Sequence, residues 1–122
     1  MLFRSEAGLA AMTNILPGYP KIDAVYSQDD ETALGALVAI ENERRTDIKF
    51  ITGFGGTRGA YERFKAGDPV YKASMSYFPT MGADGVRSCA AFLRGETLPK
   101  DTIIPSVVVT SENVDEYMVH SY

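Results

Sequence analysis

The chain has 122 residues, a formal net charge of -4 and an apolar fraction of 45%. This length fits one domain or a piece of one, and the apolar fraction is sufficient for a packed core, which excludes a disordered segment. The acidic balance argues against a nucleic-acid surface, no apolar run reaches the ~20 residues needed to cross a bilayer, and one cysteine excludes an intramolecular disulfide.

The first five residues do not resemble a natural amino terminus. Residues 1–5 lack the long apolar core and the small-residue cleavage site of a secretory signal. They also match what a common sequencing adaptor would encode if it were translated. We therefore expect a non-native leader over 1–5, a chain truncated upstream, and the carboxyl-terminal part of a domain over 6–122.

Hydrophobic spacing predicts alternating helices and strands through the first half of the chain. The predicted elements are a helix over 6–16, a strand over 22–27, a helix over 31–44 and a strand over 48–52. Pro17 and Gly18 end the first helix, and a glycine-rich loop over 53–56 follows the second strand.

The second half continues the alternation. The predicted elements are a helix over 58–66, a strand over 71–77, a helix over 79–93, a strand over 103–109 and a short helix over 111–117. Thr57 is a suitable N-cap for the first of these, and Pro105 indicates an edge or a bend in the last strand. The order predicts an α/β fold with a mainly parallel, doubly wound sheet and flanking helices.

A polar elbow follows the first predicted strand. Gln28, Asp29 and Asp30 stand where ligands bind in open α/β sheets, beyond the carboxyl end of a strand. Their amide and carboxylate groups suit a polyhydroxylated molecule. Because Asp is also a good N-cap, we expect Asp30 to cap the next helix and Asp29 to face a cleft.

Aromatic residues and glycines follow the next two strands. In a parallel sheet Phe54, Gly55 and Tyr77 would reach the same edge as the polar elbow. Aromatic faces pack on the C–H faces of sugars, so this mixture predicts a sugar site, although core packing also explains Phe54, Tyr77 and Phe78. The glycines lack the spacing of a dinucleotide or phosphate motif and are better explained by a tight turn.

No catalytic group is apparent. His120, the single histidine, is expected to be a solvated residue near the end of the chain, and Cys89 falls in a helical pattern that predicts a small buried residue. Asp29 and Asp30 are adjacent, unlike a spaced acid/base pair. We expect no enzyme activity, no metal and no cofactor.

Several colinear motifs resemble one family. The elbow Ser27–Leu37 is similar to the family pattern A-Q-N-D-E-M-A-L-G-A-L, and the segments Ile51–Thr57, Gly95–Pro99 and Val109–Tyr117 continue the match. The chain resembles the carboxyl-terminal part of a ribose-type periplasmic sugar-binding protein, the substrate-binding component of an ABC importer. The resemblance implies a fragment: an incomplete lobe of a two-lobed, type I protein that closes on a monosaccharide or sugar alcohol.

The resemblance also implies a changed binding site. Asp29 stands where the family has Asn, Gly55 where it has Asp, and Tyr77 where it has Gln. With Gln28 and Phe54, these are the expected ligand-binding residues. The three departures predict a sugar or sugar alcohol other than ribose.

The same resemblance implies partners that the chain lacks. They are an amino-terminal lobe, on which the helix at 79–94 would pack with its apolar side, and a membrane permease. It also implies a periplasmic or extracytoplasmic location, with a signal peptide outside this fragment, and no nucleic-acid partner. Two alternatives stay open: the sugar-sensing effector domain of a lactose-repressor-type regulator, and a nucleotide-binding enzyme fragment.

Overall fold

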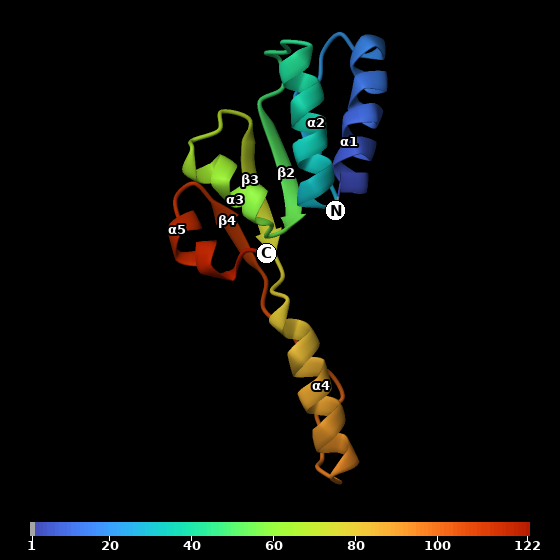
Figure 1. Ribbon diagram of the computed structural model, residues 1–122, viewed down its shortest axis with the longest axis vertical. Helices are drawn as coiled ribbons and strands as arrows, with labels where there is room; N and C mark the ends of the chain where they lie inside the picture. The colour runs from blue at the N-terminus through green and yellow to red at the C-terminus, as the bar shows by residue number, and fades with distance from the viewer. Residues whose placement is uncertain (1) are drawn as a thin grey trace.

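The computed structural model describes residues 2–122, which form a four-stranded sheet with helices packed against one face and one helix that projects away (Figure 1). The helices are α1 (Leu2–Ile15), α2 (Asp30–Asn42), α3 (Arg58–Lys65), α4 (Thr80–Leu93) and α5 (Val114–Tyr117), with 3-10 turns η1 (Leu16–Gly18) and η2 (Met118–His120). The strands are β1 (Ala24–Tyr26), β2 (Phe50–Gly55), β3 (Tyr71–Ser76) and β4 (Val107–Thr110).

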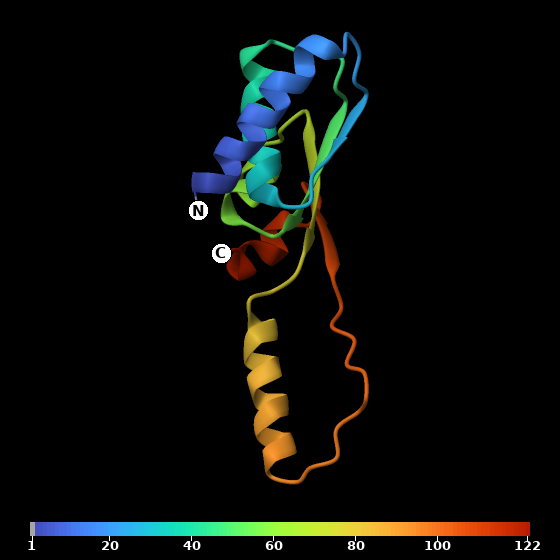
Figure 2. The ribbon, with the colours of Figure 1, turned by 90° about the vertical axis from the view of Figure 1, so that its right-hand side faces the viewer.

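The sheet has the order β1-β2-β3-β4. The first three strands are parallel and β4 is antiparallel to β3, which confirms the predicted α/β class with a mainly parallel sheet. The crossovers from β1 to β2 and from β2 to β3 are right-handed and run in the same direction across the sheet. Their helices α2 and α3 therefore lie on the same face, together with α1 (Figure 2). The carboxyl ends of the parallel strands therefore meet at one edge, where the predicted site residues lie.

Several predicted strand boundaries were wrong, two of them by three residues or more. Strand β2 continues through Gly55, so most of the predicted loop over 53–56 is strand. Strand β4 begins only at Val107, two residues after Pro105, because proline has no N–H for the ladder. Residues 94–106 run back to the sheet without regular structure.

Helices α1 and α2 approach each other closely through glycines. Gly35 lies against the backbone carbonyl of Ser5, and Gly8 lies against the carbonyl of Thr32, so neither position has room for a Cβ atom. The Ser5 hydroxyl also donates a hydrogen bond of 2.8 Å to a Glu31 carboxylate oxygen. Helix α1 thus continues across the predicted boundary between residues 5 and 6.

The core lies between this helical layer and the sheet. Its largest fully buried side chains belong to aromatic residues of α3 and β3 and to aliphatic residues of α2, β2 and β4: Tyr61, Phe64, Tyr71, Leu37, Ile51 and Val109. On the opposite face of the sheet, by contrast, Tyr26 is 77% exposed and Val108 is 50% exposed. That face has no covering helix among residues 2–122 (Figure 2).

Helix α4 projects away from the sheet together with the segment that follows it (Figures 1 and 2). Val86 and Leu93 are 70% and 83% exposed. Cys89 is exposed as well, so the prediction that it is buried was wrong, because α4 packs on no other helix in the described part of the chain. No helix within residues 2–122 has the length and apolar character to cross a membrane.

The glycine contact between α1 and α2 gives a direct test. Gly35→Ala should destabilise the protein by about 1–3 kcal/mol, because its methyl group would overlap the Ser5 carbonyl. Gly82→Ala is the matched control, since Gly82 is also helical but has no neighbour within 4 Å, and should stabilise α4 by up to about 1 kcal/mol. Urea unfolding followed by circular dichroism measures both; equal effects would contradict the packing described here.

Candidate functional site

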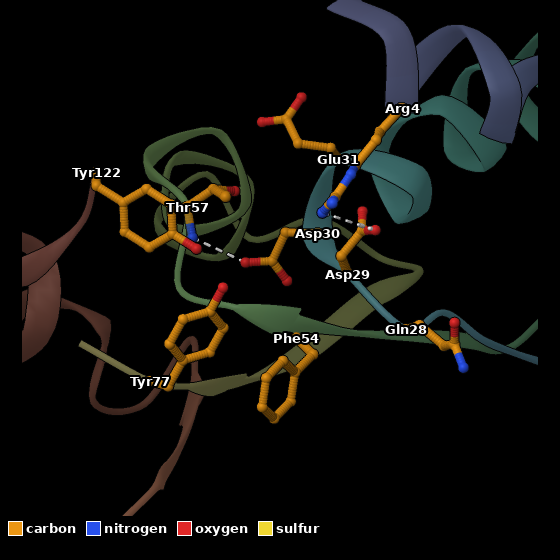
Figure 3. Close-up of a pocket in the computed structure, with 9 residues that line it drawn as sticks. All are labelled: Arg4, Gln28, Asp29, Asp30, Glu31, Phe54, Thr57, Tyr77 and Tyr122. Carbon is orange, nitrogen blue, oxygen red and sulfur yellow. Dashed lines mark hydrogen bonds and ion pairs between the residues drawn. The ribbon is translucent and has the colours of Figure 1, made fainter. Parts of the chain in front are cut away.

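A pocket of about 710 Å³ lies at the carboxyl edge of the parallel strands. Six segments contribute to its lining, which consists of Arg4, Gln28, Asp29, Asp30, Glu31, Phe54, Thr57, Tyr77 and Tyr122 (Figure 3). The wall combines carboxylates, an amide, a guanidinium and three aromatic rings. The structure therefore brings the polar elbow together with Phe54 and Tyr77, as the sequence predicted.

The two aspartates of the elbow have different roles from those predicted. Asp29, in extended backbone conformation, is the N-cap of α2, and its Oδ1 accepts a 2.7 Å hydrogen bond from the Thr32 N–H. The prediction that Asp30 caps this helix was wrong, because Asp30 is already its first residue. Asp29 still lines the pocket, where its Oδ2 lies 3.6 Å from Nη1 of Arg4.

Asp30 is fully buried and is the centre of a hydrogen-bond network. Its Oδ2 accepts from the backbone N–H groups of Gly56 and Thr57, both at 2.8 Å. Its Oδ1 accepts from the hydroxyl groups of Tyr71, at 2.8 Å, and Ser74, at 2.6 Å. These four donors stabilise the buried charge and connect the start of α2 to the β2–α3 elbow and to β3.

The network needs a glycine and keeps a tyrosine protonated. A Cβ atom at Gly53 would overlap both the Tyr71 hydroxyl and Asp30 Oδ1, so only glycine lets these two groups meet. Burial, followed by the negative charge of Asp30, raises the pKa of Tyr71 far above its usual range. Tyr71 is therefore a permanent hydrogen-bond donor to Asp30.

The aromatic residues form one wall of the pocket. The rings of Phe54 and Tyr77 are 5.3 Å apart at an angle of 31°, and Tyr77 is 40% exposed, so core packing does not account for it. Phe78 instead stacks on Tyr117, at 6.3 Å and 12°, and lies outside the pocket lining. Thr57 caps α3 as predicted, with its hydroxyl oxygen accepting from the Ala60 N–H at 3.5 Å.

Gly55 and Gln28 occupy contrasting places. Gly55 is buried with a φ of +133°, a conformation that side chains disfavour, and a Cβ atom added there would lie 3.0 Å from the Tyr122 hydroxyl oxygen. Gln28 is exposed at the rim, and its amide points away from the aromatic rings (Figure 3). Of these two predicted residues, only Gln28 belongs to the pocket lining.

Three lining residues were missed by the sequence reasoning. Arg4 fell in the expected leader, and Glu31 stands one position beyond the residues considered in the elbow. Tyr122 carried no local signal, because only the turn η2 brings it back to the β2–α3 elbow. There its carbonyl oxygen accepts a 3.0 Å hydrogen bond from the Arg58 N–H.

Comparisons with known proteins find relatives over most of the chain. A family model described as a periplasmic binding protein domain matches residues 4–97, which include Arg4 and Ser5 from the expected leader. The ribose import binding protein of Salmonella typhimurium is 36% identical over 95 residues, covering 77% of this chain and 31% of its own. A xylitol-binding protein of Mycolicibacterium smegmatis is 30% identical over 119 residues, covering 97% of this chain and 34% of its own.

A solved structure shows the same fold. An ABC transporter solute binding protein of Bacillus halodurans with bound myo-inositol superimposes with a TM-score of 0.84 and 32% identity. The match covers 95% of this chain and 40% of that protein. The chain spans about a third of the length of the curated relatives it matches.

The different roles of the two aspartates predict different losses of stability. Asp29→Ala should cost about 1 kcal/mol, the usual effect of removing an N-cap. Asp30→Ala should cost about 3 kcal/mol or more, because it leaves four buried donors unpaired.

Asp30→Asn serves as the milder variant if Asp30→Ala does not fold. Its remaining oxygen can accept from the two backbone N–H groups, while the two hydroxyl groups can turn to accept from the amide. Its loss in urea unfolding should fall between the other two. A larger loss for Asp29→Ala than for Asp30→Ala would contradict the network.

Proposed function

The chain belongs to the periplasmic binding protein domain family, and from this membership we propose that it forms part of the substrate-binding component of an ABC importer for a monosaccharide or sugar alcohol. The ribose, xylitol and myo-inositol binding of the relatives supports this class of ligand. Their transport-related names also favour this reading over a transcription regulator.

The composition of the pocket is the observation that carries the proposal. Asp29 and Glu31 place carboxylate oxygens on one side, while Phe54 and Tyr77 present aromatic surface on the other (Figure 3). A polyol offers hydroxyl groups to the first and C–H faces to the second. The pocket lies beyond the carboxyl ends of the strands, where ligands bind in sheets of this class.

We infer that the preferred ligand differs from ribose. Asp29 and Tyr77 stand at two of the three positions at which the chain departs from the ribose-type pattern, and Gly55, at the third, presents no side chain to a ligand. Asp29 offers acceptors in place of a donor amide, while Tyr77 adds a ring with a hydroxyl group. Sugar alcohols and cyclic polyols are the candidates that the relatives suggest.

The proposed function is ligand binding without a catalytic step. The family consists of solute-binding proteins, and the proposed ligand would be delivered to a membrane permease from a periplasmic location. Catalysis needs a positioned acid, base or nucleophile. In the described residues the one histidine instead packs its ring 5.1 Å from Phe78, outside the pocket lining.

We also propose that α4 packs on an amino-terminal lobe that lies outside this chain. Its exposed apolar residues support this, because Val86, Phe92 and Leu93 are 70%, 68% and 83% exposed. An apolar hollow on α4 is lined by Phe92 and Leu93 together with Ser88, Cys89 and Leu98. A contiguous apolar patch exposed to water marks a surface that packs against another part of a protein.

This placement of α4 predicts a pattern of hydrogen exchange. In the chain alone, the amides of α4 should exchange faster than those of α2, which is buried. Supplying the amino-terminal lobe of the parent protein in trans should slow exchange in α4, and Leu93→Asp should cancel that effect. Unchanged exchange in α4 on adding the lobe would contradict the proposed contact.

Ligand-observed NMR on the purified chain tests the proposed function. Xylitol and myo-inositol should bind more tightly than ribose, with a Kd of about 1 mM or weaker, because a single lobe supplies the contacts. Tyr77→Ala should remove the signal, whereas the control Tyr26→Ala, on the uncovered sheet face, should leave it unchanged. No binding of any polyol, or equal losses in the two variants, would contradict the proposal.

A further inference from the structure

Tyr122 enters the pocket from a part of the chain that no ligand-binding prediction included. Its ring lies 6.5 Å from that of Tyr77, and the hydroxyl groups of both tyrosines point toward the space beside Asp30 (Figure 3). The main-chain oxygen of Tyr122 accepts a hydrogen bond from the Arg58 N–H. This bond fixes the backbone of Tyr122 beside the start of α3. Tyr122 is thus held in the pocket by its main chain, and its phenol is left to line the cavity.

Gly55 makes this position possible. A Cβ atom at Gly55 would lie 3.0 Å from the Tyr122 hydroxyl oxygen and 3.6 Å from Asp30 Oδ2. The phenol therefore occupies the space that a side chain at position 55 would take. A larger residue at position 55 would place its own side chain there. In this chain the neutral hydroxyl group of Tyr122 takes that place instead.

The Asp30 carboxylate, which lies beside Tyr122, does not compete with it for a ligand. Both oxygens of Asp30 already accept two hydrogen bonds each from protein donors, so Asp30 has little capacity to bind a ligand. Burial, and then contact with Tyr77 and the charge of Asp30, raise the pKa of Tyr122. The Tyr122 phenol therefore stays protonated at neutral pH, able both to donate and to accept.

We propose that Tyr122 is a specificity-determining residue that hydrogen-bonds a hydroxyl group of the bound polyol, and that Gly55 is the structural complement that makes room for it. This inference rests on the proposed function, since it concerns the same pocket. It assigns the recognition of one ligand hydroxyl to a phenol pair, Tyr77 and Tyr122. A site that hydrogen-bonds a hydroxyl group discriminates against ligands that lack it.

A double-mutant cycle on stability tests the Gly55–Tyr122 relation without any ligand. Gly55→Ala should lower the urea midpoint, and the drop should be at least halved in a Tyr122→Ala background because the clash is removed. Gly67→Ala is the matched control: its φ of +73° is also unfavourable, but nothing lies within 4 Å. Its effect should be the same in both backgrounds, and additive effects of Gly55→Ala would overturn the structural complement.

Ligand-observed NMR titrations then test the role in recognition. Tyr122→Phe should weaken the binding of the preferred polyol about five- to tenfold. It should also lower the ratio of the affinity for that polyol to the affinity for ribose. Tyr19→Phe, at an exposed residue outside the pocket, is the control and should change neither.

The outcomes separate this inference from the proposed function. If the unchanged chain binds a polyol and Tyr122→Phe alters neither affinity nor preference, the inference is wrong while the proposed function stands. If the unchanged chain binds none of the polyols, the proposed function is wrong, and the recognition role of Tyr122 falls with it.

Discussion

The buried carboxylate of Asp30 is the interaction on which the rest of the site depends. It is fully buried, and a charge in that position is tolerated only when it is fully hydrogen-bonded. Its four donors come from the β2–α3 elbow and from β3, while Asp30 itself begins α2. One side chain therefore fixes the relative positions of three segments that line the pocket.

This constraint explains the glycines better than a tight turn does. Gly53 is needed because Asp30 and Tyr71 meet over its Cα atom. Gly56 has a φ of +88°, and a Cβ atom added there would lie 2.7 Å from the Tyr61 hydroxyl oxygen. Together with Gly55 they let the elbow approach the carboxylate closely enough for two backbone N–H groups to reach it. The buried Asp30 carboxylate determines the backbone conformation of the site. Contacts with a ligand therefore fall to side chains nearer the surface.

The sequence was sufficient for the sheet and for the edge at which the site lies, because both follow from hydrophobic periodicity and short crossovers. It could not separate the roles of Asp29 and Asp30, since both are aspartates, which cap helices well, and only burial distinguishes them. Tyr122 could not be found either, because its place depends on the path of the chain after β4. Colinear motifs pointed to Tyr77, which the structure places in the pocket lining, and to Gly55, which lies beside the pocket but outside its lining.

The uncovered surfaces bear on how tightly the pocket can bind a ligand. Most of the highly exposed apolar residues lie on the far face of the sheet, along α4 and in the segment after it, while Tyr77 and Tyr122 expose part of their rings in the pocket. A polyol bound to one wall would keep much of its surface in water, and its hydrogen bonds would compete with solvent. Tight binding therefore requires a second wall that excludes water. The exposed apolar surface of α4, proposed above to pack on an amino-terminal lobe, would position that wall, so we expect stability and affinity to rise together when that lobe is supplied.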